Sequence, residues 1–258
     1  DVYKRQRVDW EKLEQQLADP QTTLMILCNP QNPAGNIWDY ETLARIGALC
    51  KQYDVIVVSD EIHCDLTKPG TEYIPFASVD DTCRDISVTC IAPTKTFNLA
   101  GLQTAAVYAE TSILHHRMWR QLNTDEVAEP NAFAIQATIA AFQYGEEWLD
   151  ELREYMEKNK QYVTEFLQEK IPLIHPVAGD ATYLMWLDCR KITESGRQFA
   201  KFIRKTSGLY VSGGNQYGKG GEGFLRVNVA TSKLVVEDGM QRLYESVDAW
   251  LKEEKISK

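Results

Sequence analysis

The sequence predicts an α/β fold, with a mostly parallel sheet between two layers of helices, followed by a smaller α+β domain. In the first part of the chain, short apolar runs alternate with segments of helical periodicity, which predicts crossover connections between parallel strands. The runs are apolar at almost every position, so the strands are expected to be buried on both faces. After Ala134 long helices replace this alternation, which indicates a second domain.

Each element follows from its local pattern. Residues 9–17 are amphipathic, and Asp9 is a candidate N-cap for a short helix. Strands are expected within 23–29, 55–63, 85–94 and 103–109, and helices at 40–54, 134–145 and 146–170. We expect the domain boundary near Gly145, so that residues 1–145 form the first domain and residues 146–258 form the second, including a bridging helix.

The composition of the chain excludes several classes of function. The chain has 258 residues, 44% of them hydrophobic, and a net charge of −9, which argues against nucleic acid or an anionic membrane as the main partner. No apolar run approaches the ~18 residues of a membrane span, and no signal peptide is evident. The six cysteines form no C-x-x-C pair, which favours reduced thiols in a cytoplasmic protein and no metal site.

Polar residues follow two of the expected strands. Asn32 lies in NPQNPAG, a turn made rigid by two Asn-Pro steps, although an ordinary strand-to-helix turn would have the same composition. Asp60 ends the strand of VIVVSDEIH and needs a partner if it is buried. That partner could be a helix N-terminus or a structural cation. The acidic box of a P-loop nucleotide hydrolase is a further alternative, but the chain has no G-x-x-x-x-G-K-[ST] motif.

Two cationic residues are further candidates for the functional site. Lys95, in CIAPTKTFNLAG, follows a strand, and a lysine in such a place can form a Schiff base, although a surface lysine is the default interpretation. Thr94 beside it could reach a phosphate. Arg226 lies in the apolar strand FLRVNVA, where either a ligand carboxylate or an intramolecular Asp or Glu would satisfy it.

Together, NPQNPAG, VVSDEIH, APTKTF and FLRVNVA resemble the aminotransferase class I/II family of fold-type I pyridoxal-phosphate enzymes, in the same order and with similar spacing. SDEIHCDL, APTKTFNLAGLQ and ATYLMWLDCR look most like its cystathionine β-lyase branch. The resemblance implies the cofactor pyridoxal 5′-phosphate (PLP), a small amino-acid substrate and a homodimer. It also implies that residues 1–145 are the C-terminal part of a large PLP-binding domain, in a chain truncated at its N-terminus.

The resemblance also implies roles for individual residues. Lys95 would bind the cofactor covalently and remove the substrate Cα proton, and Asp60 would pair with the pyridine nitrogen. Asn32 would hydrogen-bond the phenolic oxygen of the ring. Arg226 would hold the substrate carboxylate. Thr94 is the candidate for a phosphate contact.

Three positions depart from ordinary transaminases. His63 stands where many have Tyr, so it is a weaker candidate for a contact with the cofactor ring. Ala92 and Gln103 replace a Ser and an Arg that usually bind the phosphate. These departures favour β-elimination from cystathionine or cysteine-like substrates, with an aminotransferase as the first alternative and a non-catalytic module of the same fold as the second.

Overall fold

The computed structural model describes residues 7–256, and its contacts divide the chain into two units. The first contains residues 8–31 and 36–153. The second contains Arg7, residues 32–35 and residues 154–256. We call them the N-terminal unit and the C-terminal unit. Residues 1–6, part of the stretch that shows no periodic pattern, lie outside the described range. The boundary expected near Gly145 stays a prediction.

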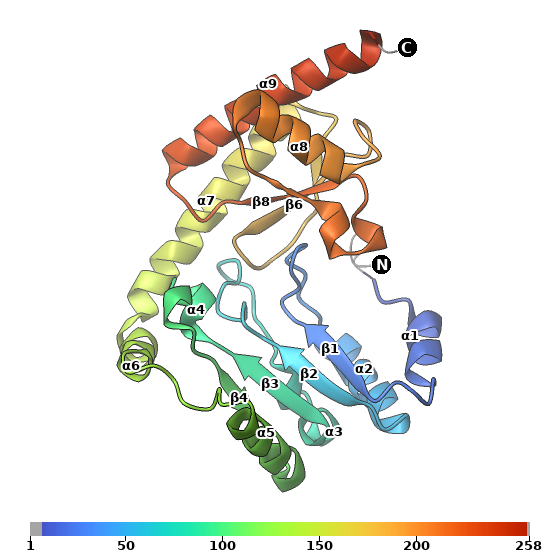
Figure 1. The fold of residues 1–258 in the computed structure, drawn as a ribbon, viewed down its shortest axis with the longest axis vertical. Helices are drawn as coiled ribbons and strands as arrows, with labels where there is room; N and C mark the ends of the chain where they lie inside the picture. The colour runs from blue at the N-terminus through green and yellow to red at the C-terminus, as the bar shows by residue number, and fades with distance from the viewer. Residues whose placement is uncertain (1–6, 257–258) are drawn as a thin grey trace. The chain divides into compact units, whose positions relative to one another are not determined.

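The N-terminal unit is built on a four-stranded sheet in the order β1-β2-β3-β4 (Figure 1). β1 (Leu24–Cys28), β2 (Ile56–Asp60) and β3 (Ser87–Ile91) are parallel, and β4 (Ala106–Tyr108) is antiparallel to β3. The mostly parallel sheet expected from the sequence is confirmed.

The helices of this unit are α1 (Trp10–Leu17), α2 (Tyr40–Gln52), α3 (Asp81–Asp85), α4 (Pro93–Thr96), α5 (Ser112–Thr124) and α6 (Ala134–Tyr144). Short 3₁₀ helices lie at η1 (Phe76–Ser78) and η2 (Ala100–Leu102). Asp9 caps α1 as expected, because its carboxylate accepts a hydrogen bond from the Lys12 backbone N–H at 3.1 Å.

The two faces of this sheet are covered differently. Residues of α1, α2 and α3 pack on one face, around Leu27 and Val57. The opposite face packs against α5 near Val88, but Leu24 and Ile26 of β1 are 50% and 66% exposed. The expectation that β1 is covered on both faces is therefore wrong for the described residues. An apolar run shows which side chains favour burial, but not whether a segment covers them.

The C-terminal unit is a four-stranded sheet in the order β5-β6-β8-β7, in which all pairs are antiparallel. Its strands are β5 (His175–Pro176), β6 (Leu184–Asp188), β7 (Ser212–Gly213) and β8 (Phe224–Asn228). Its helices are α8 (Gly196–Ser207), α9 (Lys233–Ile256) and most of α7 (Glu146–Lys170), with the 3₁₀ helices η3 (Gly214–Tyr217) and η4 (Lys219–Gly221).

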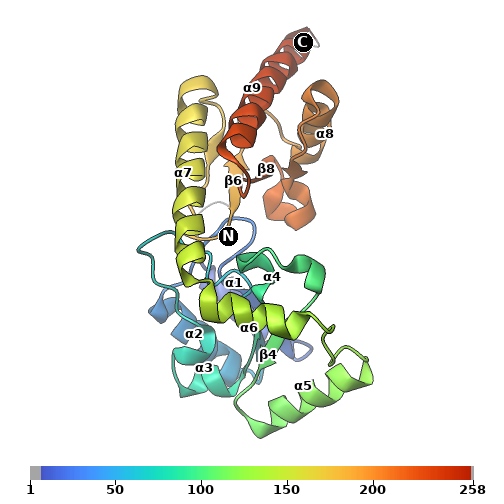
Figure 2. The same cartoon turned by 90° about the vertical axis from the view of Figure 1, so that its left-hand side faces the viewer.

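The core of the C-terminal unit lies on one face of this sheet. Side chains of α7, α8 and α9 pack against Leu187 and Leu225, and α8 lies alongside α9 (Figure 2). Residues alternate along a strand, so Trp186 and Arg226, which are paired in register, lie on the opposite face. There the buried Trp186 stacks on Phe224, with ring centroids 5.2 Å apart. One face of the sheet therefore carries the main core, and the other carries a smaller buried cluster beside Arg226.

Candidate active site

Asp60 is the last residue of β2, at the carboxyl end of the parallel strands, where α/β sheets commonly bind ligands. It is paired in register with Cys28 of β1 and Cys90 of β3. Its carboxylate accepts only weak hydrogen bonds, from the Cys28 thiol at 3.8 Å and from the Ile62 backbone N–H at 3.3 Å. Among the described residues no lysine or arginine pairs with it, so the structural ion pair considered above is not observed.

The two thiols keep the surroundings of Asp60 free of other charge within the sheet. Burial raises the pKa of the Cys28 thiol, and the negative charge of Asp60 raises it further. Burial is also the larger cause that raises the pKa of the Cys90 thiol, and the charge of Asp60 is the second. Both side chains are therefore neutral near pH 7. The negative charge of Asp60 is left to interact with a cationic group of a ligand.

Glu61, the next residue, has a different environment. It is 2% exposed, and its Oε1 accepts hydrogen bonds from the Ser59 hydroxyl at 2.8 Å and from the Phe76 backbone N–H at 3.1 Å. Burial raises the pKa of Glu61 above its ordinary value, although both hydrogen bonds oppose the shift. Glu61 therefore fixes the chain that follows β2 and is not available to a ligand.

We expect Glu61→Gln to make the stability of the protein less dependent on pH. A carboxyl whose pKa is raised on folding stabilises the folded state most at low pH, and the contribution is lost as pH rises through the raised pKa. Glutamine keeps the acceptor oxygen but does not ionise. Unfolding by urea at pH 5 and pH 7 should show the wild type losing more stability than the variant. The exposed Glu72→Gln is the control, and an unchanged pH dependence in Glu61→Gln would contradict the assignment.

Lys95 lies in α4, the single helical turn that follows β3. Pro93 and Thr96 of this turn are buried, and the Thr96 hydroxyl donates to Asp65 at 3.0 Å. These contacts anchor the turn and leave the Lys95 side chain exposed, without an ion-pair partner among the described residues. Thr94 is half-buried beside it. Because β2 and β3 are parallel neighbours, Asp60 and Lys95 follow the same edge of the sheet.

Arg226 and Asn32 lie together in the C-terminal unit. The guanidinium Nη1 of Arg226 donates to the Asn32 amide oxygen at 3.1 Å, and the group lies 4.9 Å from the centroid of the Tyr217 ring. No Asp or Glu pairs with Arg226 in the part of the chain that the structure describes. Of the two partners considered for this arginine, the intramolecular carboxylate is therefore not observed, which leaves its charge for a ligand anion.

The loop that carries Asn32 is held by a close backbone contact. Gly35 has a φ of +72°, and a Cβ there would lie 2.5 Å from the Ala181 carbonyl oxygen. The Ala181 N–H in turn donates to the Gly35 carbonyl at 3.1 Å. Only glycine combines this left-handed conformation with this approach. The turn in NPQNPAG is therefore more than a connection, because it fixes the position of Asn32 against Arg226.

The remaining candidate, His63, is 4% exposed in the turn after β2. Among the described residues no group of three His, Cys, Asp or Glu side chains could hold a metal ion. The sequence interpretation missed Cys28 and Cys90 as neighbours of Asp60, although aligning the apolar runs as parallel strands in register would have placed them there. It also missed the contact of Tyr217 with Arg226, for which the sequence has no signal.

Comparisons with known proteins identify the family of this chain. Residues 1–243 match the model of the family described as aminotransferase class I and II, and the chain belongs to this family. It is 42% identical to the cystathionine beta-lyase PatB of Bacillus subtilis over 92% of the chain, and 32% identical to the protein MalY of Escherichia coli over 93%. In both cases it covers 61% of the relative's length.

Solved structures show the same fold. Cystalysin from Treponema denticola, which contains a pyridoxal 5′-phosphate cofactor, superposes with a TM-score of 0.91 at 28% identity, over 94% of this chain and 62% of its own. The PLP-bound C-S lyase from Staphylococcus hominis gives a TM-score of 0.84 at 32% identity, over 93% and 61%. The expected fold, a PLP-dependent transferase large domain present in part with a smaller C-terminal domain, is confirmed.

Proposed function

We propose that this protein is a PLP-dependent carbon–sulfur β-lyase that acts on cystathionine or on cysteine-like substrates. The observation that carries the proposal is a set of uncompensated charges on residues that match the family motifs. Asp60 lacks a cation, and Lys95 and Arg226 lack a carboxylate, among the described residues. Asp60 and Arg226 are partly buried, where a charge without a partner is costly, so their charges favour a ligand. Lys95 is exposed, and its role depends on the family motif that it matches.

The donor set fits PLP. Asp60 can accept a hydrogen bond from a pyridinium N–H, Lys95 can bond to the aldehyde carbon, and the Asn32 amide can contact the phenolic oxygen. Thr94 is the candidate phosphate contact. When bound, PLP supplies an electron sink for the charge left by removal of a proton from the substrate Cα. The thiols beside Asp60 are neutral, so its carboxylate would be the charged group that holds a proton on the ring nitrogen when PLP is bound.

Two residues of the chain then have separate roles in the reaction. Arg226 forms a bidentate pair with the substrate α-carboxylate and orients the Cα–H bond. The Lys95 amine takes the Cα proton. The C–S bond breaks and its electrons leave with sulfur as a thiolate, which takes up a proton. The remaining aminoacrylate adds water and releases pyruvate and ammonia.

The relatives favour elimination over amino transfer. Within one organism, B. subtilis, the chain is 42% identical to a cystathionine beta-lyase and 22% identical to an aspartate aminotransferase. Both activities would use the same lysine, so an assay must separate them. Because the chain spans 61% of the length of PatB, we would assay the chain itself and a fusion with the part of PatB that it does not cover, called the PatB fusion.

The assay supplies PLP and cystathionine, measures pyruvate in the absence of an acceptor keto acid and, separately, measures transfer of the amino group to that acceptor. Pyruvate without the acceptor is the expected result. Strict dependence on the acceptor would identify an aminotransferase and contradict the proposal, as would no reaction of either kind in the PatB fusion. The matched control is the fusion with Lys95→Ala, which should release no pyruvate.

We also propose a cytoplasmic homodimer. No helix in the described part of the chain is long and apolar enough to cross a membrane. All six cysteines are unpaired, which fits a reducing compartment. Large apolar side chains are exposed on α5 and α6, among them Trp119, Ile135 and Phe142, which are 59%, 53% and 50% exposed. A face of this kind supports contact with a second copy, and light scattering of the PatB fusion should give twice the monomer mass.

A further inference from the structure

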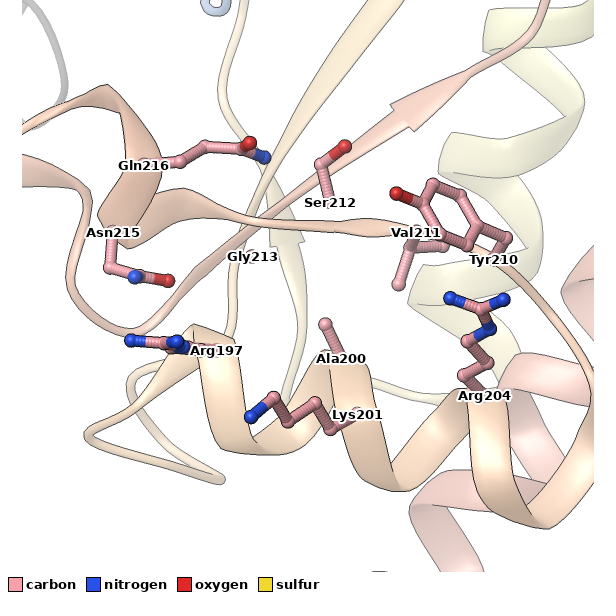
Figure 3. Close-up of a pocket in the computed structure, with 10 residues that line it drawn as sticks. All are labelled: Arg197, Ala200, Lys201, Arg204, Tyr210, Val211, Ser212, Gly213, Asn215 and Gln216. Atoms are coloured by element: carbon pink, nitrogen blue, oxygen red, sulfur yellow. The ribbon is translucent and has the colours of Figure 1, made fainter.

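The C-terminal unit contains a cavity that none of the candidate cofactor or substrate residues lines. It has a volume of about 460 Å³ and lies between α8 and the segment 210–216, which includes β7 (Figure 3). This volume falls in the range of small-molecule sites, and the pocket is open to solvent, since Arg197, Lys201 and Arg204 are all exposed. We call it the α8 pocket.

One wall of the α8 pocket is cationic. Arg197, Lys201 and Arg204 line it from successive turns of α8, and Arg204 points toward Tyr210 on the opposite wall (Figure 3). The helix carries four basic residues and no acidic one, although the chain has a net charge of −9. None of the three lining cations has a carboxylate partner among the described residues. Like charges at this spacing repel each other, so an anion bound between them would stabilise the helix.

The opposite wall supplies neutral polar groups. β7 is the edge strand of its sheet, and Asn215 and Gln216 follow it in η3. Their side-chain amides have no hydrogen-bond partner among the described residues, and both line the pocket. Unpaired amides beside unpaired cations are the groups that bind the oxygen atoms of an anion.

The spacing of the two walls is set by glycine. A Cβ at Gly213 of β7 would lie 2.8 Å from the Arg197 Cα, and a Cβ at Gly196 would lie 2.1 Å from the Phe224 carbonyl oxygen. Larger residues would push α8 away from the strands. The first turn of α8 is therefore held against β7, and the pocket is a fixed part of this unit.

An aromatic ring lies at one end of the pocket. Tyr210 is 71% exposed, and the Arg204 guanidinium lies 5.0 Å from the centroid of its ring. A planar group could stack on this ring or on the guanidinium plane.

We propose that the α8 pocket binds a small phosphorylated molecule. Two arginines and one lysine match two or three negative charges, which is more than a single carboxylate carries. Arg197 and Lys201 hold the phosphoryl oxygen atoms, and the amides of Asn215 and Gln216 donate to them. Tyr210 and Arg204 are available to an aromatic ring of the same molecule, such as a nucleoside base.

The test is calorimetric titration of the PLP-saturated PatB fusion with pyrophosphate and with ATP. Saturation with PLP keeps these probes out of the candidate active site. The double variant Arg197→Gln/Lys201→Gln should bind both probes at least about tenfold more weakly, as expected for the loss of charge-assisted hydrogen bonds. Lys205→Gln is the matched control, because Lys205 lies on the same helix but does not line the pocket. It should change the affinity by less than about twofold.

Two further measurements keep the outcome interpretable. Backbone amide shifts of the 258-residue chain on addition of pyrophosphate should be concentrated in residues 196–216, and thermal unfolding checks that each variant is folded. Equal weakening by Lys205→Gln, shifts spread over the unit, or no binding of either probe would overturn the proposal. Tighter binding of ATP that Tyr210→Ala abolishes would assign the ligand an aromatic ring, and equal binding of the two probes would assign the phosphoryl group alone. Both of these results support the pocket.

Discussion

Lys95→Ala is expected to abolish covalent attachment of PLP. It should also lower lyase activity by roughly 10²–10⁴-fold or more, because a general base alone contributes a factor of that size. In the proposed reaction the same amine bonds to the cofactor and then takes the substrate proton, so its loss removes two functions at once. The measurement is reduction with borohydride in the presence of PLP, followed by peptide mapping. The wild type should carry the reduced cofactor on Lys95, and the variant should lack the visible absorbance of attached PLP.

The control for this experiment is Lys51→Ala, which removes an exposed lysine from α2 without touching the edge of the sheet. It should keep both the absorbance and the activity. If the absorbance survives in Lys95→Ala, or if reduction labels another lysine to the same extent, the assignment of Lys95 is wrong. Because the readout is attachment rather than turnover, it is independent of whether the bound enzyme eliminates or transfers.

The sequence predicts most of the fold because burial leaves a local pattern. The run TLMILCN becomes β1, and the amphipathic pattern of 40–54 becomes α2, in both cases within two residues of the expected ends. The exposure of Ile26 could not be predicted in this way. Whether an apolar residue is covered depends on which segment packs on it, and that is a long-range property of the chain.

The residues of the candidate site could also be predicted only in part from local sequence patterns. Asp60 and Lys95 could be selected because each follows an apolar strand, and the carboxyl ends of parallel strands meet at one edge. Asn32 and Arg226 lie far apart in sequence, and the hydrogen bond between them has no local signal. Only the motif resemblance brought those two residues into one proposed site. Their position in the same unit gives that proposal geometric support.

Arg226→Ala should lower kcat/KM for the lyase reaction by roughly 10- to 150-fold, the equivalent of a charge-assisted hydrogen bond worth about 1.5–3 kcal/mol. The guanidinium has no carboxylate partner among the described residues, so its removal takes away a ligand contact and leaves no other charge unpaired. Attachment of PLP to Lys95 should persist. The comparison with Lys95→Ala therefore separates binding of the substrate from binding of the cofactor.

A substrate analogue without the α-carboxylate tests whether Arg226 binds that group of the substrate. The wild type should prefer cystathionine over the decarboxylated analogue, and Arg226→Ala should lose most of that preference, because the discrimination comes from the pair that the variant cannot form. Arg226→Lys should recover only part of it, since an ammonium group cannot form a bidentate pair with a carboxylate. Arg190→Ala is the matched control. Arg190 lies 5.0 Å from the Phe224 ring but pairs with Asp188 within the unit, so its removal should leave the preference intact. A preference that survives in Arg226→Ala would mean that another group holds the carboxylate.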